Sequence, residues 1–260
     1  SVIEHQSGLG ADIVMPLDVC IALPAKREDA ERAVEQTNRW AERSRNAHRN
    51  SSQLLFGIVQ GGLYSDLREH SAQFLTQMEF PGYSIGGLSV GESKDDMYRL
   101  TKDTAQLLPE ATPRYLMGVG SPEDLVECVW RGIDIFDCVL PTRVARNGAL
   151  FTHNGRIDIK SHQFKNYSGP VDDNCECLTC KTFSMSYIHH LFKAKEMLSY
   201  RLATIHNLSF INKLMTGMRN AILENKFDSF RDNFLSRYKS TDESIRLSQK
   251  KMWMKTRSGH

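Results

Sequence analysis

The sequence has no apolar run long enough to cross a membrane, and it has little net charge. Its 33 Lys and Arg residues against 31 Asp and Glu residues give a formal net charge of +2. A membrane-spanning helix needs about 18 consecutive apolar residues, and a histone-like protein needs a large basic excess. The composition therefore argues against both classes, although it leaves room for a local basic face that binds nucleic acid.

Cysteine is scarce over most of the chain. Three of the six cysteines are scattered, at Cys20, Cys128 and Cys138, and the other three lie close together. A disulfide-stabilised secreted domain would carry cysteines throughout, and no secretory signal is visible. We therefore expect a reducing, cytoplasmic location, where a tight group of cysteines indicates a metal site.

The sequence does contain a repeated alternation of short apolar runs and amphipathic segments. Helical patterns at 28–45, 93–108 and 121–132 lie between the runs, and the last two open with Ser followed by acidic residues, as helix starts do. This alternation, with nearly continuous apolar strands, predicts a parallel α/β sheet. The apolar runs, each ending in Gly or a polar residue, cover 11–18, 54–62, 82–92, 114–120 and 132–143.

Two α/β architectures place their functional sites at the carboxyl ends of parallel strands, the (β/α)8 TIM barrel and the open doubly wound sheet. We favour the barrel. Since only five strands are expected before the cysteine cluster and a barrel needs eight, the barrel would lack its N-terminal strands in this chain. The chain also opens without Met, which fits a fragment or a processed product.

We predict four segments. Residues 1–147 form the C-terminal part of the barrel, and 148–206 form an inserted zinc-binding subdomain that begins with a β-hairpin turning at Asn154–Gly155. Residues 207–240 form C-terminal helices that close the barrel, and 241–260 form a polar tail.

The clustered cysteines have the spacing Cys-x-Cys-x-x-Cys, at Cys175, Cys177 and Cys180. Tetrahedral Zn²⁺ takes four sulfur or nitrogen ligands, and three neighbouring thiols without a metal would be prone to oxidation. A site filled by four protein ligands would be structural. Spacing alone leaves three candidates for the fourth ligand, His189, His190 and His206.

Polar residues and glycines gather where the predicted strands end. Any one of them could simply cap a helix or shape a loop, but four on one rim favour a site. A carboxylate can accept two hydrogen bonds from a guanine-like base, Gln can donate and accept, and Gly-Gly leaves backbone N–H groups accessible. A second carboxylate could then attack a sugar carbon, as in retaining glycosidases. The strand-end residues are Asp18, Gln60, Gly86–Gly87 and Asp137.

Two arginines, Arg143 and Arg146, follow Asp137. They could hold phosphates or stack on bases, or they could be solvated loop charges. We favour contact with nucleic acid.

Several long motifs together resemble the bacterial tRNA-guanine transglycosylase family, from about residue 5 to about residue 240. The resemblance implies an enzyme that exchanges guanine for 7-aminomethyl-7-deazaguanine (preQ1), a precursor of queuosine. The guanine is the wobble base, position 34, of tRNAs with a G-U-N anticodon (those for Asp, Asn, His and Tyr), flipped into the barrel mouth. The motifs are "GIVQGG", "IGGLSVGE", "RYLMGVG", "FDCVLPTRVARNG", "CECLTC" and "SYIHHL…TIHN".

The resemblance also implies roles for individual residues. Asp137 matches the nucleophile that attacks ribose C1′, and Arg143 and Arg146 match arginines that grip the anticodon loop. His206 matches the fourth zinc ligand, beside the three clustered cysteines. Tyr187 and His190 match contacts of the bacterial homodimer. The positions that match the purine pocket are Asp18, Cys20, Gln60, Gly87, Leu88 and Met117.

Some residues narrow the resemblance to the bacterial branch of the family, and other features depart from the family's pattern. Cys20 and Val90 resemble the bacterial enzymes rather than the eukaryotic relatives that take the bulkier queuine. The family's proposed general acid/base Asp and its base-stacking aromatic residue lie upstream of Ser1. Ser121 replaces a Lys that many bacterial relatives carry, which predicts one weaker RNA contact. A non-catalytic tRNA-binding relative and an inactive truncated remnant are therefore the alternatives.

Overall fold

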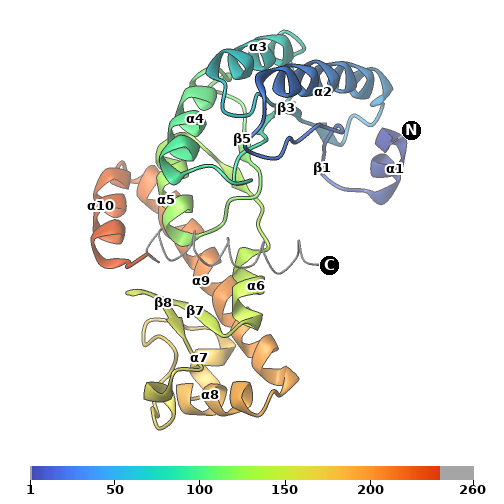
Figure 1. The fold of residues 1–260 in the computed structure, drawn as a ribbon. Helices are drawn as coiled ribbons and strands as arrows, with labels where there is room; N and C mark the ends of the chain where they lie inside the picture. Colours follow the sequence, from blue (N-terminus) through green and yellow to red (C-terminus); the bar gives the residue numbers. More distant parts are fainter. Residues whose placement is uncertain (1, 241–260) are drawn as a thin grey trace. The chain divides into compact units, whose positions relative to one another are not determined.

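The computed structural model describes residues 2–240, and the predicted polar tail at 241–260 lies outside them. The chain divides into two compact units between Val139 and Leu140, and Figure 1 draws the elements of both. No helix within residues 2–240 has the length and apolar character that a membrane crossing requires.

The first unit contains parallel strands, as predicted. Each of the five apolar runs holds a strand segment, and Phe56 alone separates β2 from β3 within the second run. The strands pair in parallel in the orders β1-β2 and β3-β4-β5-β6. The parallel sheet is confirmed, and its closure into a barrel stays a prediction. The strands are β1 (Ile13–Val14), β2 (Leu54–Leu55), β3 (Gly57–Val59), β4 (Tyr83–Ile85), β5 (Arg114–Leu116) and β6 (Ile135–Phe136).

Helices alternate with these strands and lie along one side of the sheet (Figure 1). The three predicted helices are confirmed as α2, α4 and α5. Ser93 caps α4 with its side chain, which accepts a hydrogen bond from Asp96 N. Ser121 is the N-cap residue of α5, as predicted, but its side chain makes no cap hydrogen bond. The helices are α1 (Val2–Leu9), α2 (Arg27–Ala47), α3 (Ser65–Thr76), α4 (Lys94–Gln106) and α5 (Pro122–Trp130).

The core of the first unit explains the nearly continuous apolar runs. All residues of β3 and β4 are buried, because helices cover one face of the sheet and other core side chains cover the other. Leu75 from α3 and Leu100 from α4 pack into the same cluster as Ile85. This packing holds the carboxyl ends of the strands at one edge of the sheet.

The second unit begins with a short helix and a hairpin. The hairpin is antiparallel, and Thr152 pairs with Gly155. The turn therefore consists of His153–Asn154, one residue before the predicted position. Gly155 lies in β8 with φ +124, and a Cβ there would lie 2.4 Å from the Lys239 carbonyl oxygen, so only Gly fits. The elements are α6 (Leu140–Arg146), β7 (Ala149–Thr152), β8 (Gly155–Asp158), η1 (His162–Phe164), α7 (Leu178–Thr182), α8 (Met185–Lys193), α9 (Met197–Leu223) and α10 (Phe227–Arg237).

The long helix α9 organises this unit. It contacts α6, α7, α8, α10 and β7. Because α6 packs on α9, residues 140–146 belong to the second unit, although we expected them to end the last barrel run. Helix α9 also continues through residue 206, so the boundary predicted at 206/207 falls inside one helix. The assignment of the four segments to a barrel, a zinc-binding subdomain, closing helices and a polar tail stays a prediction.

Candidate active site and metal site

Asp137 is held at the end of β6 by two donors from the neighbouring strand segment. Its Oδ1 accepts a hydrogen bond from the Tyr115 hydroxyl at 2.6 Å and another from the Gly118 backbone N–H at 3.0 Å. No described residue bonds to Oδ2, and the side chain is exposed. One oxygen is therefore fixed, while no hydrogen bond within residues 2–240 holds the other.

The Tyr115 hydroxyl is a dependable donor in this pair. Burial raises the pKa of Tyr115, and its hydrogen bond to the Asp137 carboxylate raises it further. The hydroxyl therefore stays protonated at neutral pH and remains a hydrogen-bond donor to the Asp137 carboxylate.

Asp18 and Gln60 form a second polar pair, from the ends of the first and second strand runs. Gln60 Nε2 donates to Asp18 Oδ2 at 2.6 Å. Gln60 is almost completely buried, at 1% exposure, and its Oε1 has no hydrogen-bond partner among the described residues. A buried amide oxygen without a donor is costly, so Gln60 suits a ligand that supplies an N–H group.

Gly86 and Gly87 lie against the Gln60 side chain. A Cβ at Gly86 would lie 2.5 Å from Gln60 Nε2, and a Cβ at Gly87 would lie 2.4 Å from Gln60 Oε1. Gly87 also has φ +67, which glycine tolerates best. The absence of side chains here lets the backbone approach the amide, and the next residue, Leu88, is buried.

The remaining pocket residues lie beside these groups. Cys20 is exposed. The pKa of the Cys20 thiol is raised, mainly because surrounding atoms desolvate it and secondly because of the negative charge of Asp18. The thiol is therefore neutral at pH 7. Met117 follows β5, is partly buried, and donates its N–H to the Ile85 carbonyl at 3.3 Å.

The order of the strands brings the predicted residues together. Because β3, β4, β5 and β6 are successive parallel neighbours, their carboxyl ends meet at one edge of the sheet. Gln60, Gly87, Met117 and Asp137 follow these four strands in that order, and Asp18 joins them through its bond to Gln60. The edge therefore carries a set of polar groups that ends with the carboxylate of Asp137, after β6.

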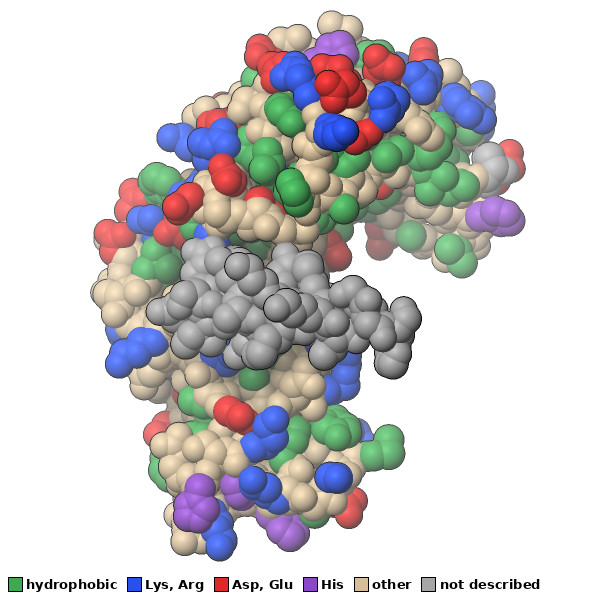
Figure 2. Space-filling model, viewed as in Figure 1, with side chains coloured by type: hydrophobic (Ala, Val, Ile, Leu, Met, Phe, Trp, Pro, Cys, Tyr) green, Lys and Arg blue, Asp and Glu red, His purple; other side chains and the backbone are tan. Residues whose placement is uncertain are grey.

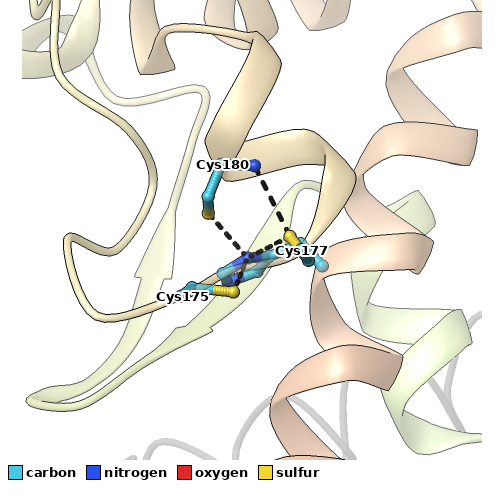
Figure 3. A group of neighbouring side chains, drawn as sticks. Cys175, Cys177 and Cys180 are labelled. Carbon is cyan, nitrogen blue, oxygen red and sulfur yellow. Dashed lines mark hydrogen bonds between the residues drawn. The ribbon is translucent and has the colours of Figure 1, made fainter.

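A second cluster lies in the other unit. The side chains of Cys175, Cys177 and Cys180 converge in Figure 3, from the loop before α7 and from α7 itself. With His206 from α9 they offer three sulfurs and one nitrogen, all within 4.8 Å of one another. Of the three candidate histidines, His206 completes the group, whereas His189 directs its Nδ1 to the Ile159 carbonyl.

The distances in this cluster fit a tetrahedral ion. His206 Nδ1 lies 3.6, 3.7 and 3.3 Å from the sulfurs of Cys175, Cys177 and Cys180. Zinc ligands at about 2.3 Å for sulfur and about 2.0–2.1 Å for nitrogen would place sulfur and nitrogen about 3.6 Å apart. The four residues could therefore hold a metal ion without rearrangement.

Backbone groups orient the ligands. His206 Nε2 lies 2.7 Å from the Phe151 carbonyl oxygen, so the ring donates its proton there and presents Nδ1 to the sulfurs. Such a contact fixes both the tautomer and the orientation of a metal-binding histidine. The neighbouring Asn207 is buried and bonds to Phe151 N and to the Pro141 and Ala149 carbonyls, which ties α9 to β7 and α6.

Comparison with known proteins shows the family of the chain. The family model for queuine tRNA-ribosyltransferase matches residues 1–240. The chain belongs to the queuine tRNA-ribosyltransferase family. It is 51% identical over 257 residues to a queuine tRNA-ribosyltransferase of Dehalococcoides mccartyi, covering 99% of this chain and 66% of that protein.

Other queuine tRNA-ribosyltransferases are equally similar. The relative from Staphylococcus haemolyticus is 53% identical over 236 residues, which is 90% of this chain and 62% of that protein. The relative from Francisella tularensis subsp. novicida is 52% identical over 236 residues, or 91% and 64%. The chain thus spans a little under two thirds of the length of these relatives.

The predicted RNA and dimer contacts of this family member lie in the second unit. Arg143 and Arg146 are exposed on α6, which is a helix rather than the expected loop. Tyr187 and His190 are exposed on α8, and Tyr187 stacks on Phe183 with ring centroids 5.3 Å apart. Their roles in binding stay predictions.

Sequence reasoning missed three residues of the first cluster. Tyr115 and Glu92 lie inside quoted motifs, and Glu92 accepts hydrogen bonds from the backbone N–H groups of residues 89, 90 and 91. Their position inside motifs of the family could have marked both as candidate site residues. Arg68 reads as an ordinary polar residue of helix α3, and nothing in the sequence marks it as buried.

Proposed function

We propose that this chain carries the tRNA-guanine transglycosylase reaction of queuosine biosynthesis. Guanine at position 34 of G-U-N tRNAs, those for Asp, Asn, His and Tyr, would be exchanged for preQ1. The observation that carries the proposal is Asp137, held through Oδ1 with Oδ2 free, on the sheet edge that also carries the Asp18–Gln60 pair.

The reaction would proceed by two displacements at ribose C1′. Asp137 Oδ2 attacks C1′, an Asp–ribose bond forms, and the bond from C1′ to guanine N9 breaks, after which guanine takes up a proton. The incoming preQ1 then loses its N9 proton, attacks C1′ and releases the carboxylate of Asp137. This is the double-displacement logic of retaining glycosidases.

Base recognition would use groups from four strand ends. Asp18 accepts hydrogen bonds from the N1–H and amino group of the purine, and Gln60 and the Gly87–Leu88 backbone face its carbonyl oxygen. Cys20 and Met117 line the pocket. Because Gln60 Nε2 already donates to Asp18 at 2.6 Å, a bound base would replace that bond with its own.

Charge is distributed unevenly, which supports tRNA binding through the second unit. Residues 1–139 contain 13 Lys and Arg against 21 Asp and Glu, a net −8, whereas 140–240 contain 15 against 8, a net +7. On the face in Figure 2, basic and histidine side chains spread over the second unit with few acidic ones. Basic residues supply the sequence-independent part of RNA affinity, and exposed Arg143 and Arg146 are the proposed anticodon-loop contacts.

Zinc is the metal that best suits the second cluster. Three thiolates and an imidazole fill a tetrahedral site, so the ion would be structural and would leave no position for substrate. Cys175, Cys177, Cys180 and His206 would hold it and join α7 and the loop before α7 to α9. The finer architecture belongs to the same proposal: a TIM barrel, a zinc subdomain, a homodimer through Tyr187 and His190, and a cytoplasmic location.

A non-catalytic tRNA-binding role is the alternative, and the geometry of Asp137 argues against it. A binding partner has no use for a carboxylate with one oxygen fixed by Tyr115 and Gly118 and the other left free.

A denaturing gel tests the proposed function. The chain is mixed with an unmodified G-U-N tRNA and a non-reactive guanine analogue, and a protein–RNA band that survives SDS is expected. Asp137→Asn should abolish the band without changing metal content, whereas Asp95→Asn, the same change on exposed helix α4, should keep it. A band that persists in Asp137→Asn contradicts the mechanism, and no band with the unsubstituted chain favours the non-catalytic alternative.

A further inference from the structure

Arg68 is a buried cation without an ion-pair partner. It lies on α3 at 1% exposure, and no acidic side chain of residues 2–240 lies within ion-pair distance of it. Burial lowers the pKa of Arg68 to about 10, against the opposing charge of Glu92, so the guanidinium remains charged at neutral pH. Burying a charge without a counterion is unfavourable, which raises the question of what this residue does.

Its hydrogen bonds all go to backbone carbonyls of the pocket loops. Arg68 Nε donates to the Gly62 carbonyl at 2.9 Å, just past Gln60. Arg68 Nη2 donates to the Gly86 carbonyl at 3.1 Å and to the Gly87 carbonyl at 3.4 Å. One side chain thus joins the loop after β3 to the loop after β4.

These bonds set the direction of two N–H groups. In a planar trans peptide the C=O and N–H bonds point in opposite directions. Because the Gly86 and Gly87 carbonyls face Arg68, the N–H groups of Gly87 and Leu88 point away from it. The Leu88 N–H has no hydrogen-bond acceptor within the described part of the chain, and the Gly87 N–H has only the Cys20 sulfur, a weak acceptor, although both residues are buried. Buried N–H groups without a strong acceptor suit the carbonyl oxygen of a ligand.

Glycines let the two loops approach Arg68. A Cβ at Gly61 would lie 2.7 Å from Arg68 Cγ, too close for any other residue, and one at Gly87 would lie in van der Waals contact, 3.7 Å from Arg68 Nη2. Arg68 Nη1 is buried and has no partner among the described residues. The two loops therefore share the Arg68 side chain as a common contact.

We propose that Arg68 is a positioning residue of the base pocket. It fixes the Gly86–Leu88 segment so that two N–H groups face the purine carbonyl oxygen. Its charge also polarises the two peptides, because a donor at each carbonyl strengthens the N–H of the same peptide. The inference rests on the proposed function, since it assumes that the ligand is a purine with a carbonyl group.

The test compares Arg68→Met and Arg68→Lys with Arg114→Lys. Arg114 is the matched control, because it also donates to a backbone carbonyl, that of Leu108, but stands at the amino end of β5. The measurements are guanine affinity by calorimetry, tRNA affinity, the amide NMR signals of Gly87 and Leu88, and the thermal midpoint.

Loss of a charge-assisted bond in a buried site should weaken guanine binding by about 10- to 100-fold in Arg68→Met. Arg68→Lys should recover part of that loss, because an ammonium group can still reach some of the carbonyls. The affinity for tRNA should stay within about twofold in both variants, and Arg114→Lys should leave the guanine affinity unchanged. The two amide signals should shift in the Arg68 variants alone.

A lowered thermal midpoint with unchanged guanine affinity would overturn the proposal, because Arg68 would then serve stability alone. If Arg68→Met does not fold, Arg68→Lys decides by the same two readouts, guanine affinity and the amide signals. Guanine that binds without a covalent RNA band would overturn the proposed function and leave this inference standing. An unsubstituted chain that binds no guanine would overturn both.

Discussion

The hydroxyl of Tyr115 lies 2.6 Å from Oδ1 of Asp137, so a residue of β5 sets the orientation of a carboxylate that follows β6. The Gly118 N–H binds the same oxygen at 3.0 Å. Because both donors bind Oδ1, the two oxygens of the Asp137 carboxylate have different surroundings. In a freely solvated carboxylate the two oxygens would be equivalent.

Tyr115→Phe should therefore slow base exchange. A hydrogen bond to a charged group is worth about 1.5–3 kcal/mol, which corresponds to about 10- to 100-fold in kcat. The KM for guanine should change little, because Tyr115 does not contact the Asp18–Gln60 pair. Tyr98→Phe is the control, since it removes a similar 2.6 Å bond to Asp124 away from this edge. Equal losses in the two variants would show that only stability is affected.

Gly87→Ala should weaken guanine binding while the fold survives. The new Cβ would lie 2.4 Å from Gln60 Oε1, so Gln60 or the loop must move. Gly10→Ala is the control, because Gly10 also has positive φ, +72, but nothing lies within 4 Å of its Cβ. Both variants should lose about 1–2 kcal/mol of stability from backbone strain, and only Gly87→Ala should lose base affinity. Calorimetry with guanine separates the two effects.

Removal of the metal should unfold the second unit. Structural zinc contributes about 10–16 kcal/mol of apparent binding free energy to folding. The cluster joins α7 to α9, and α9 also contacts α6, α8 and α10. Cys180→Ser or a chelator should lower the thermal midpoint and the zinc content together. Cys20→Ser, which changes an exposed thiol outside the cluster, should keep one zinc per chain. A Cys180→Ser protein with normal stability and no zinc would refute a structural role.

Arg143→Ala and Arg146→Ala should each weaken tRNA binding and reduce the slope of log K against log salt by about 1. Both arginines are exposed in the unit with excess positive charge, so they can pair with phosphates. Guanine affinity should not change. Arg99→Ala is the control, because Arg99 is exposed in the acidic first unit and pairs with Asp96. An unchanged slope for both α6 variants would contradict the anticodon-loop proposal.

Local sequence patterns predicted helices and strands well where a single apolar face or a single cap residue determines where the element forms. The start of α4 follows from Ser93 and the acids after it, and each apolar run holds a short strand segment. Helical spacing is less reliable on α9: Leu214 and Met218 are buried, but Ile222, four residues after Met218, is 49% exposed, and Ala221 is buried instead. The contacts that a long helix makes at its end depend on neighbours that periodicity does not describe.

The sequence by itself determined the strand–helix alternation, the polar residues at the strand ends and the spacing of three cysteines. These features depend on interactions between residues a few positions apart. Only the tertiary structure decided which side chains meet: Gln60 with Asp18, Tyr115 with Asp137, Arg68 with Gly86, and His206 with the three cysteines. Each of these contacts joins residues well separated in the chain. The parallel sheet brings the first three pairs within hydrogen-bond distance, and the packing of α7 on α9 does the same for His206 and the cysteines.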